Sequence, residues 1–121
     1  MLLKNSLILL AVCSLASCGT KGPKVTWCTS SEFMFECSDR GRSIAEVDNY
    51  ACLSRPHAER LLSSCKQGTS PGKLEYCIVD SASRQLVCPT REISLRDANN
   101  WPCMSPTDTE RLLTYCKRQA Q

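Results

Sequence analysis

The stretch Cys103-Met-Ser-Pro-Thr-Asp-Thr-Glu-Arg-Leu-Leu-Thr-Tyr-Cys116-Lys117 decides the expected fold, because a close copy of it lies earlier in the chain. That copy is Cys52-Leu-Ser-Arg-Pro-His-Ala-Glu-Arg-Leu-Leu-Ser-Ser-Cys65-Lys66, and about half of the aligned positions are identical. Cys37 also recurs at the same offset of 51 residues, as Cys88, whereas Cys28 recurs 49 residues later as Cys77. The repeat predicts a tandem duplication with four cysteines in each copy.

Each repeated stretch has the pattern of a short amphipathic helix. In the second copy, Ser105 fits the N-cap, Pro106 fits the first helical position, and Asp108 can return a hydrogen bond to the cap. In the first copy Ser54 fits the cap, but His57 replaces the acidic partner, so we expect a weaker helix start. The apolar face comprises Leu61, Leu62 and Cys65 in the first copy and Leu112, Leu113 and Cys116 in the second.

A β-hairpin is expected before each helix, because apolar and β-branched segments flank short polar stretches there. The predicted hairpin strands and a shorter third strand are 25–29, 33–37 and 42–45 in the first copy, and 74–79, 85–88 and 92–95 in the second. The fold class is therefore a small disulfide-rich α+β protein of two tandem homologous β-hairpin–helix units. The first unit spans 26–66 and the second 74–118, and the turn-rich segment 67–73 links them.

The chain has ten cysteines, of which eight follow the N-terminal segment. An even number of cysteines in about a hundred residues is typical of a disulfide framework in exported proteins. A zinc site is not expected, because there is no Cys-x-x-Cys pair and His57 is the single histidine. The predicted disulfide residues are Cys28, Cys37, Cys52, Cys65, Cys77, Cys88, Cys103 and Cys116.

Helix geometry restricts how these cysteines can pair. Residues that flank a three-turn helix lie roughly 15–18 Å apart, whereas a disulfide needs Cα atoms within about 7 Å. Cys52–Cys65 and Cys103–Cys116 are therefore excluded, and each helix-flanking cysteine is expected to reach a hairpin cysteine of its own unit. The alternatives are Cys28–Cys52 with Cys37–Cys65, or Cys28–Cys65 with Cys37–Cys52, and their equivalents in the second unit, with bonds between the units as a further alternative.

Residues 1–17 have the pattern of a secretory signal, with Lys4 before an apolar run that is too short to span a bilayer. The segment Leu15-Ala16-Ser17-Cys18 resembles the lipobox of bacterial lipoproteins. The resemblance implies cleavage before Cys18, a diacylglyceryl group on its thiol and acylation of the new N-terminus. Ordinary cleavage after Ala16 is the alternative, but it would leave nine cysteines in the mature chain.

The same resemblance implies where the protein is located in the cell. In enteric bacteria an aspartate after the lipidated cysteine retains a lipoprotein in the inner membrane, and this chain has Gly19. We therefore expect a lipid-anchored protein of the cell envelope, in the outer membrane and facing the periplasm. Residues 18–25 are expected to be the lipidated cysteine and a flexible tether.

Charge and motif content argue against several classes of function. The formal net charge is +3, or +2 once Lys4 is removed, with both signs interspersed, so no nucleic-acid partner is expected. His57 has no second histidine to support a triad. Glu59-Arg60 and Glu110-Arg111 recur, and common descent or a shared structural ion pair would explain the recurrence without a functional role. We expect no enzyme activity, no cofactor and no small-molecule substrate.

Aromatic residues divide into two groups. Trp27, Tyr50, Tyr76 and Trp101 occupy equivalent positions in the two copies and are expected to supply most of the apolar mass of two thin cores. The alternative is a repeated aromatic anchor for a partner. The run Phe33-Met34-Phe35 lies by the tip of the first hairpin, where the second copy is polar, and it is the predicted partner-binding site.

The sequence therefore predicts a membrane-anchored, non-enzymatic binding or envelope-associated module that contacts the membrane through its lipid and an envelope protein through its surface. The alternative is an inhibitor or a phage superinfection-exclusion factor that blocks an envelope receptor or a lytic enzyme. An enzyme or redox protein is the least favoured interpretation, because no catalytic constellation is present.

Overall fold

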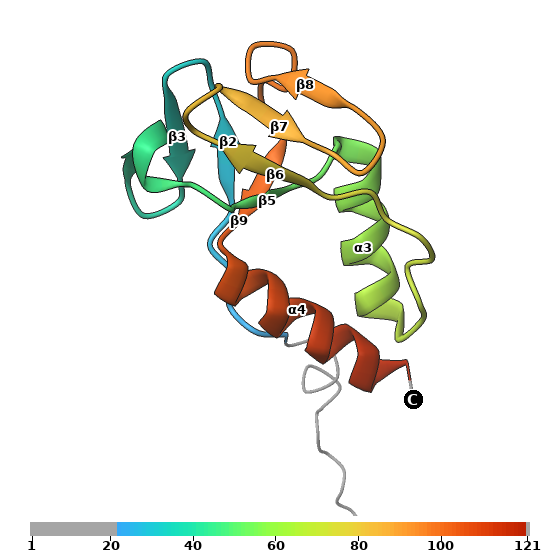
Figure 1. Ribbon diagram of the computed structural model, residues 1–121. Helices are drawn as coiled ribbons and strands as arrows, with labels where there is room; N and C mark the ends of the chain where they lie inside the picture. Colours follow the sequence, from blue (N-terminus) through green and yellow to red (C-terminus); the bar gives the residue numbers. More distant parts are fainter. Residues whose placement is uncertain (1–21, 121) are drawn as a thin grey trace, which may run out of the picture.

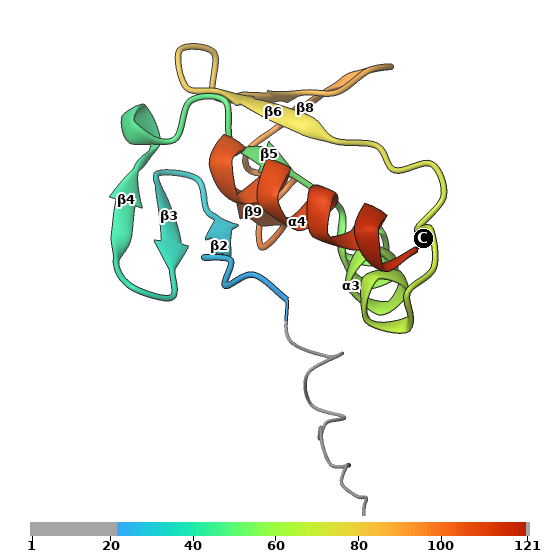
Figure 2. The ribbon, with the colours of Figure 1, turned by 90° about the horizontal axis from the view of Figure 1, so that it is seen from below.

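The computed structural model describes residues 22–120, so the predicted signal segment and the lipobox with Cys18 lie outside the described residues. The described chain forms an eight-stranded antiparallel sheet and two long helices, held by four disulfides (Figure 1). Figure 2 shows both helices on one side of the central strands, with the hairpins extending outward. The predicted class, α+β and disulfide-rich, is confirmed.

Most of the predicted elements are present. The strands are β2 (Cys28–Ser30), β3 (Met34–Cys37), β4 (Gly41–Ser43), β5 (Ala51–Cys52), β6 (Cys77–Asp80), β7 (Gln85–Val87), β8 (Glu92–Ser94) and β9 (Pro102–Met104), and the helices are η1 (Ile44–Glu46), α3 (Arg55–Gln67) and α4 (Pro106–Gln119). The sequence predicted the hairpin strands, the third strands and both long helices. It did not predict β5 and β9, which occupy the centre of the sheet.

The two central strands join the halves of the chain into one sheet. The strand order is β4-β3-β2-β9-β5-β6-β7-β8, so β9 pairs with the first hairpin and β5 with the second. Each central strand follows an asparagine in the left-handed region, Asn49 with φ 69° and Asn100 with φ 70°, which asparagine tolerates better than most residues. The Asn49 N–H donates to the Val79 carbonyl at 3.1 Å and the Asn100 N–H to the Ser30 carbonyl at 2.8 Å.

The observed disulfides differ from the predicted pairings. Cys28–Cys37 and Cys77–Cys88 join the two strands of each hairpin, while Cys52–Cys103 and Cys65–Cys116 join the two halves of the chain. The prediction that each helix-flanking cysteine pairs with a hairpin cysteine of its own unit was wrong. The helix-flanking cysteines form the less favoured bonds between the halves, and the bonds within the hairpins were not among the predicted alternatives. The reason is the missed strand pair β5·β9.

The register of the strands brings the strand cysteines side by side across the sheet, since Cys28 lies opposite both Cys37 and Cys103, and Cys52 lies opposite both Cys103 and Cys77. Cys52 lies directly opposite Cys103 on β5 and β9, with Cα atoms 4.0 Å apart, and Cys28 lies opposite Cys37 on β2 and β3. Cys65 and Cys116 join α3 to α4 at equivalent positions of the two helices. The exclusion of Cys52–Cys65 and Cys103–Cys116 is confirmed.

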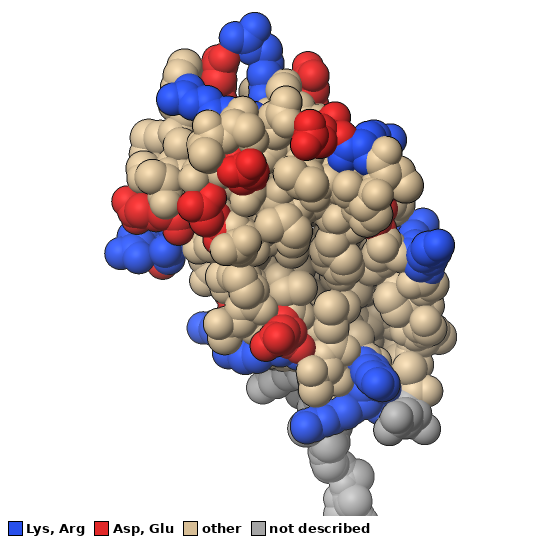
Figure 3. Space-filling model, in the orientation of Figure 1, with Lys and Arg blue, Asp and Glu red and all other residues tan. Residues whose placement is uncertain are grey.

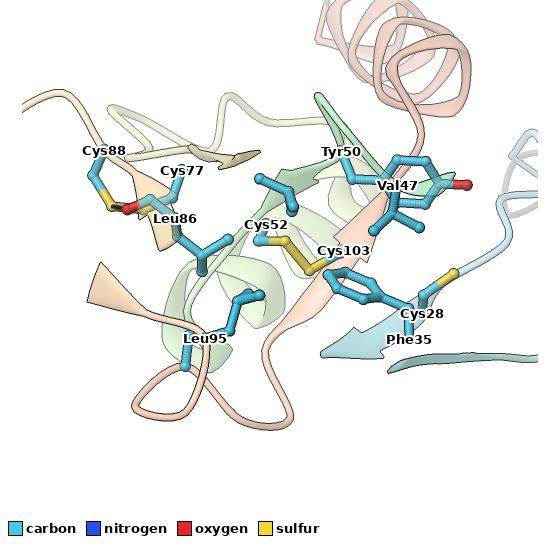
Figure 4. Close-up of a cluster of buried hydrophobic side chains, with 12 residues drawn as sticks. Cys28, Phe35, Val47, Tyr50, Cys52, Cys77, Leu86, Cys88, Leu95 and Cys103 are labelled. Carbon is cyan, nitrogen blue, oxygen red and sulfur yellow. Dashed lines mark hydrogen bonds between the residues drawn. A yellow bond between two sulfur atoms is a disulfide. The ribbon is translucent and has the colours of Figure 1, made fainter. Parts of the chain in front are cut away.

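The sheet separates two apolar clusters, because successive side chains of a strand point to opposite faces. On one face, Figure 4 shows the Cys52–Cys103 disulfide with Phe35 and Val47 on one side and Leu86 on the other. On the other face, Leu53 of the first half and Met104 of the second pack against the helices. The four paired aromatic residues all contact apolar clusters, Tyr50 and Trp101 the first cluster and Trp27 and Tyr76 the helical one, so each cluster contains residues of both halves of the chain.

The two helices begin differently, as their sequences predicted. The Ser105 hydroxyl accepts a hydrogen bond from the Asp108 N–H at 3.2 Å, whereas Ser54 makes no side-chain cap hydrogen bond. The Asp108 carboxylate does not return to the cap; it accepts from the Thr26 N–H at 3.1 Å. Leu62, expected on the buried helix face, is 45% exposed.

Tyr76 is the titratable group that the helical cluster affects most clearly. Burial raises the pKa of the Tyr76 phenol above its ordinary value of 10.0, because a phenolate is disfavoured in apolar surroundings. The pKa of Tyr76 is higher in the folded than in the unfolded protein, so the neutral phenol favours the folded state. This contribution to the free energy of unfolding is complete below pH 10 and is lost as the pH rises through the folded-state pKa.

We therefore expect wild-type protein to lose more unfolding free energy between about pH 9 and pH 11 than the variant Tyr76→Phe. Denaturant unfolding at both pH values measures the difference, and the same comparison at pH 7 corrects for the lost hydroxyl. Identical pH dependence in the two proteins would contradict this account of Tyr76.

Candidate binding surface

Two turns from different halves of the chain meet at one end of the molecule. The turn between β2 and β3 carries Glu32 and Phe33, Met34 begins β3, and the turn between β6 and β7 carries Arg84. Arg96, in the loop after β8, completes the group. We call these five residues the hairpin-tip surface.

An aromatic ring and a guanidinium join the two turns. The Arg84 guanidinium carbon lies 5.4 Å from the centre of the Phe33 ring, within the range of a cation–π contact. Phe33 is nevertheless 62% exposed and Met34 43% exposed. The contact therefore orients the ring without burying it, and leaves apolar surface available to a partner.

An ion pair joins the same turn to the loop after β8. The Arg96 guanidinium donates to the Glu32 carboxylate from Nε at 3.1 Å and from Nη2 at 2.5 Å. This hydrogen bond and the carboxylate charge raise the pKa of Arg96 further above its ordinary range, so the guanidinium is charged at every physiological pH. Both side chains are substantially exposed, so the pair contributes little to stability but fixes the position of Arg96.

Short polar side chains hold both turns in shape. In the first turn the Ser31 N–H donates to the Met34 carbonyl at 2.9 Å, and the Ser31 hydroxyl accepts from the Met34 N–H at 3.0 Å. In the second turn the Asp80 carboxylate accepts from the Ala82 N–H at 3.2 Å and from the Ser83 hydroxyl at 2.9 Å. The exposed Phe33 and Arg84 are therefore presented by hydrogen-bonded turns.

A second contact supports the turn that carries Arg84. The Asp48 carboxylate, from the loop before β5, accepts the Ser81 N–H at 2.8 Å. Hydrogen bonds from Ser81 hold the pKa of Asp48 below its ordinary value of 3.8, so this support persists at neutral pH and weakens only as the carboxylate is protonated in acid.

An open depression of about 460 Å³ adjoins the exposed ring. Its lining includes Leu95, which is almost fully buried, together with charged side chains of both signs. The lining residues are Glu32, Arg84, Ser94, Leu95, Arg96 and Asp97. An apolar projection beside a depression with fixed charges of both signs is suited to a protein surface, where aromatic residues and arginines supply most of the binding energy.

The structure corrects the predicted contact run at one position. Phe35 is fully buried and packs edge-on against Tyr50, with ring centres 6.2 Å apart. Alternation along β3 turns Phe35 inward while Met34 stays exposed. Phe35 therefore belongs to the core, and only Phe33 and Met34 remain in the candidate surface.

Arg84 and Arg96 were not predicted as site residues. In the sequence, Arg84 lies in the polar stretch between two predicted strands and Arg96 directly follows the predicted third strand, and neither position belongs to a motif. A signal for Arg84 was present, since it occupies the position equivalent to Phe33 at the offset of 51 residues.

The recurring Glu-Arg pairs contribute a structural arginine in each helix. Arg60 donates to the carbonyls of Pro71, at 3.0 Å, and of Lys73, at 2.5 Å. Arg111 donates to the carbonyl of Lys24 and, at 2.9 Å, to the Asp108 carboxylate. Each arginine thus ties the segment that leads into a hairpin to a helix, without using the adjacent glutamate as its partner.

Other candidate chemistry does not come together in residues 22–120. His57 is half-buried beside Lys73 and Glu75, in a pocket without a nucleophile–base pair. Glu75 lies close to Cys77 and Cys88, a spacing that could hold a metal ion. The two sulfurs form a disulfide, however, so neither offers the thiolate that a metal requires.

Comparisons with known proteins provide no relative for this chain. No protein-family model, curated protein or solved structure matches it. Within the described residues, neither helix has the length and apolar character needed to cross a membrane.

Proposed function

We propose that the protein is a lipid-anchored envelope module that faces the periplasm and binds a protein partner through the hairpin-tip surface. The observation that carries this proposal is Phe33, an aromatic ring that is 62% exposed although ordered by Arg84. An exposed aromatic anchor beside fixed charges is the usual centre of a protein–protein contact.

The position of this surface supports the proposal. Figure 1 shows the hairpin turns at one end of the molecule, while the described chain begins beside α4 at the other end. If the N-terminus is tethered to a membrane through Cys18, the hairpin-tip surface is directed toward the periplasm, where a partner can reach it.

The number of paired cysteines supports a lipid anchor at Cys18. All eight cysteines of residues 22–120 have one another as disulfide partners. None of them is left to pair with Cys18, which fits a role for that thiol in acylation. This even pairing is the outcome that cleavage before Cys18 requires.

We also propose that the chain arose by tandem duplication of a β-hairpin–helix unit. The strand order reads the same from either end when β2, β3, β4 and β5 are matched to β6, β7, β8 and β9. Contacts repeat in the same way, since the Tyr50 N–H donates to the Val47 carbonyl and the Trp101 N–H, 51 residues later, to the Ala98 carbonyl. In this proposal the units exchange their last strands.

Site-specific photo-crosslinking in the living host tests the binding surface. We expect a photoreactive phenylalanine analogue at position 33 to give one discrete adduct in the envelope, and the second change Arg84→Glu to remove it by releasing the ring. The matched control places the analogue at Val87, which is 41% exposed on the outer face of β7. The same adduct from both positions, or none from position 33, would contradict the proposal.

A further inference from the structure

Charge is divided unequally between the two layers of the molecule. The helical layer, residues 22–27, 53–76 and 104–120, has eight basic and four acidic side chains, a net charge of +4. The hairpin layer, residues 28–52 and 77–103, has five basic and eight acidic side chains, a net charge of −3. The near-neutral total therefore conceals a molecule with a basic end and an acidic end.

The basic charge reaches the surface where the two helices finish. Lys66 in the last turn of α3 and Lys117 and Arg118 in the last turn of α4 are all exposed. The Cys65–Cys116 disulfide holds these two turns together, and the Gly68 C-cap lies against the Gln119 carbonyl. Figure 3 shows basic side chains around this lower end of the molecule. We call Lys66, Lys117 and Arg118 the basic helical end.

The described chain begins against the same helix. Gly22 packs so closely on α4 that a Cβ added there would lie 3.2 Å from the Tyr115 ring. Further along, Arg111 binds the Lys24 carbonyl and Asp108 accepts the Thr26 N–H. Of the tether predicted at residues 18–25, residues 22–25 thus lie along α4.

This anchorage limits how far the domain can stand from its lipid. Three residues separate Cys18 from Gly22, and an extended chain gains at most about 3.5 Å per residue, so the reach from Cys18 to Gly22 is about 14 Å. That upper limit is between one and two screening lengths, which are about 8–10 Å at physiological ionic strength. A lipidated Cys18 would therefore keep the start of the described chain, and α4 beside it, close enough for α4 to reach the electrostatic field of the membrane surface.

We propose that the basic helical end lies on the anionic phospholipid headgroups of the leaflet that holds the acylated Cys18, with the hairpins directed away from it. This inference rests on the lipid anchor of the proposed function and adds an orientation and a lipid chemistry. Clustered lysines and arginines beside a membrane anchor are attracted by anionic headgroups, and the acidic hairpin layer is repelled by them.

Amine footprinting of the acylated full-length protein tests this orientation. The protein is reconstituted into vesicles of phosphatidylcholine with 30% phosphatidylglycerol, or of phosphatidylcholine alone, and treated with a water-soluble acylating reagent. Lys73 is the internal reference, because it is exposed and lies beside His57 and Pro89 at the opposite end of α3. We expect labelling of Lys66 and Lys117, relative to Lys73, to fall about fivefold on the anionic vesicles only.

Charge reversal provides matched variants. Lys117→Glu with Arg118→Glu should restore Lys66 labelling on the anionic vesicles, while the lipid still carries the protein with the vesicles in flotation. Arg40→Glu with Arg91→Glu makes the same change of charge in the hairpin layer. This variant should show the same labelling of Lys66 and Lys117 as the wild type.

Two outcomes overturn the inference and separate it from the proposed function. If labelling of Lys66 and Lys117, relative to Lys73, is the same on anionic and neutral vesicles for an acylated, floating protein, the headgroup contact is rejected and the anchor stands. An intact mass without acyl groups on Cys18, together with failure to float, rejects the anchor and the orientation together.

Discussion

Replacing both Cys52 and Cys103 with alanine is expected to lower the free energy of unfolding by about 3.5 kcal/mol. When Cys65–Cys116 is intact, the Cys52–Cys103 bond closes a ring of about 28 residues, which consists of segments 52–65 and 103–116. For a ring of that size, the loss of chain entropy in the unfolded state corresponds to about 3.5 kcal/mol. Guanidinium unfolding of the purified, oxidised variant measures the change.

The hairpin bond Cys77–Cys88 is the matched control. It closes a loop with a sequence separation of 11 residues, for which the same treatment gives about 2.8 kcal/mol. Removing both bonds between the halves should cost about 7–8 kcal/mol, which is comparable to the whole stability of a small domain. An equal or larger loss from the hairpin pair than from Cys52–Cys103 would contradict the role assigned to the central bond.

The change Phe35→Ala is expected to cost about 3–5 kcal/mol, because it removes a fully buried ring and leaves a cavity beside Tyr50. The edge-on contact between the two rings adds to the loss beyond the buried area. Thermal or denaturant unfolding at pH 7 measures it.

Phe33→Ala is the matched control, two positions away on the same hairpin. Its ring is 62% exposed, so the expected loss is the cation–π contact with Arg84, about 0.5–1 kcal/mol. Similar losses from the two changes would mean that Phe35 does not occupy the core or that Phe33 is not exposed. The same pair separates stability from binding, since only Phe33→Ala should weaken partner contact in a folded protein.

The local elements could be predicted from the sequence because their signals are local. Ser105 and Pro106 define the start of α4, and the apolar spacing of Leu112 and Cys116 defines its buried face. The hairpins follow from β-rich segments on either side of polar turns. These choices depend on neighbours within a few residues, where capping, turn chemistry and periodicity act.

The centre of the sheet could not be predicted in the same way. β5 has two residues and β9 has three, the first of which is Pro102. Segments so short have no readable alternation, and their strand conformation comes from pairing with residues about 50 positions away. The one sequence signal was the recurrence of Asn49-Tyr50 as Asn100-Trp101, which marks a shared left-handed turn before each strand. Missing these strands led directly to the wrong disulfide pairing.

Only two of the five residues of the hairpin-tip surface could be predicted from the sequence. Phe33 and Met34 were identified because an apolar run at a hairpin tip has no local reason to be there. Phe35 was included because the run was treated as a unit, although alternation along β3 turns it inward. Arg84 and Arg96 depend on how the two halves meet, which the sequence did not show.

The pairing of β5 with β9 has a consequence for the order in which the disulfides can form as the chain is synthesised from its N-terminus. Cys28 and Cys37 can pair as soon as the first hairpin has formed, and Cys77 and Cys88 likewise. Cys52 and Cys65 must remain reduced, or be corrected by an isomerase, until Cys103 and Cys116 arrive. Once all four bonds are closed, a protease that cuts between α3 and β6 releases nothing, because two disulfides still hold the fragments together.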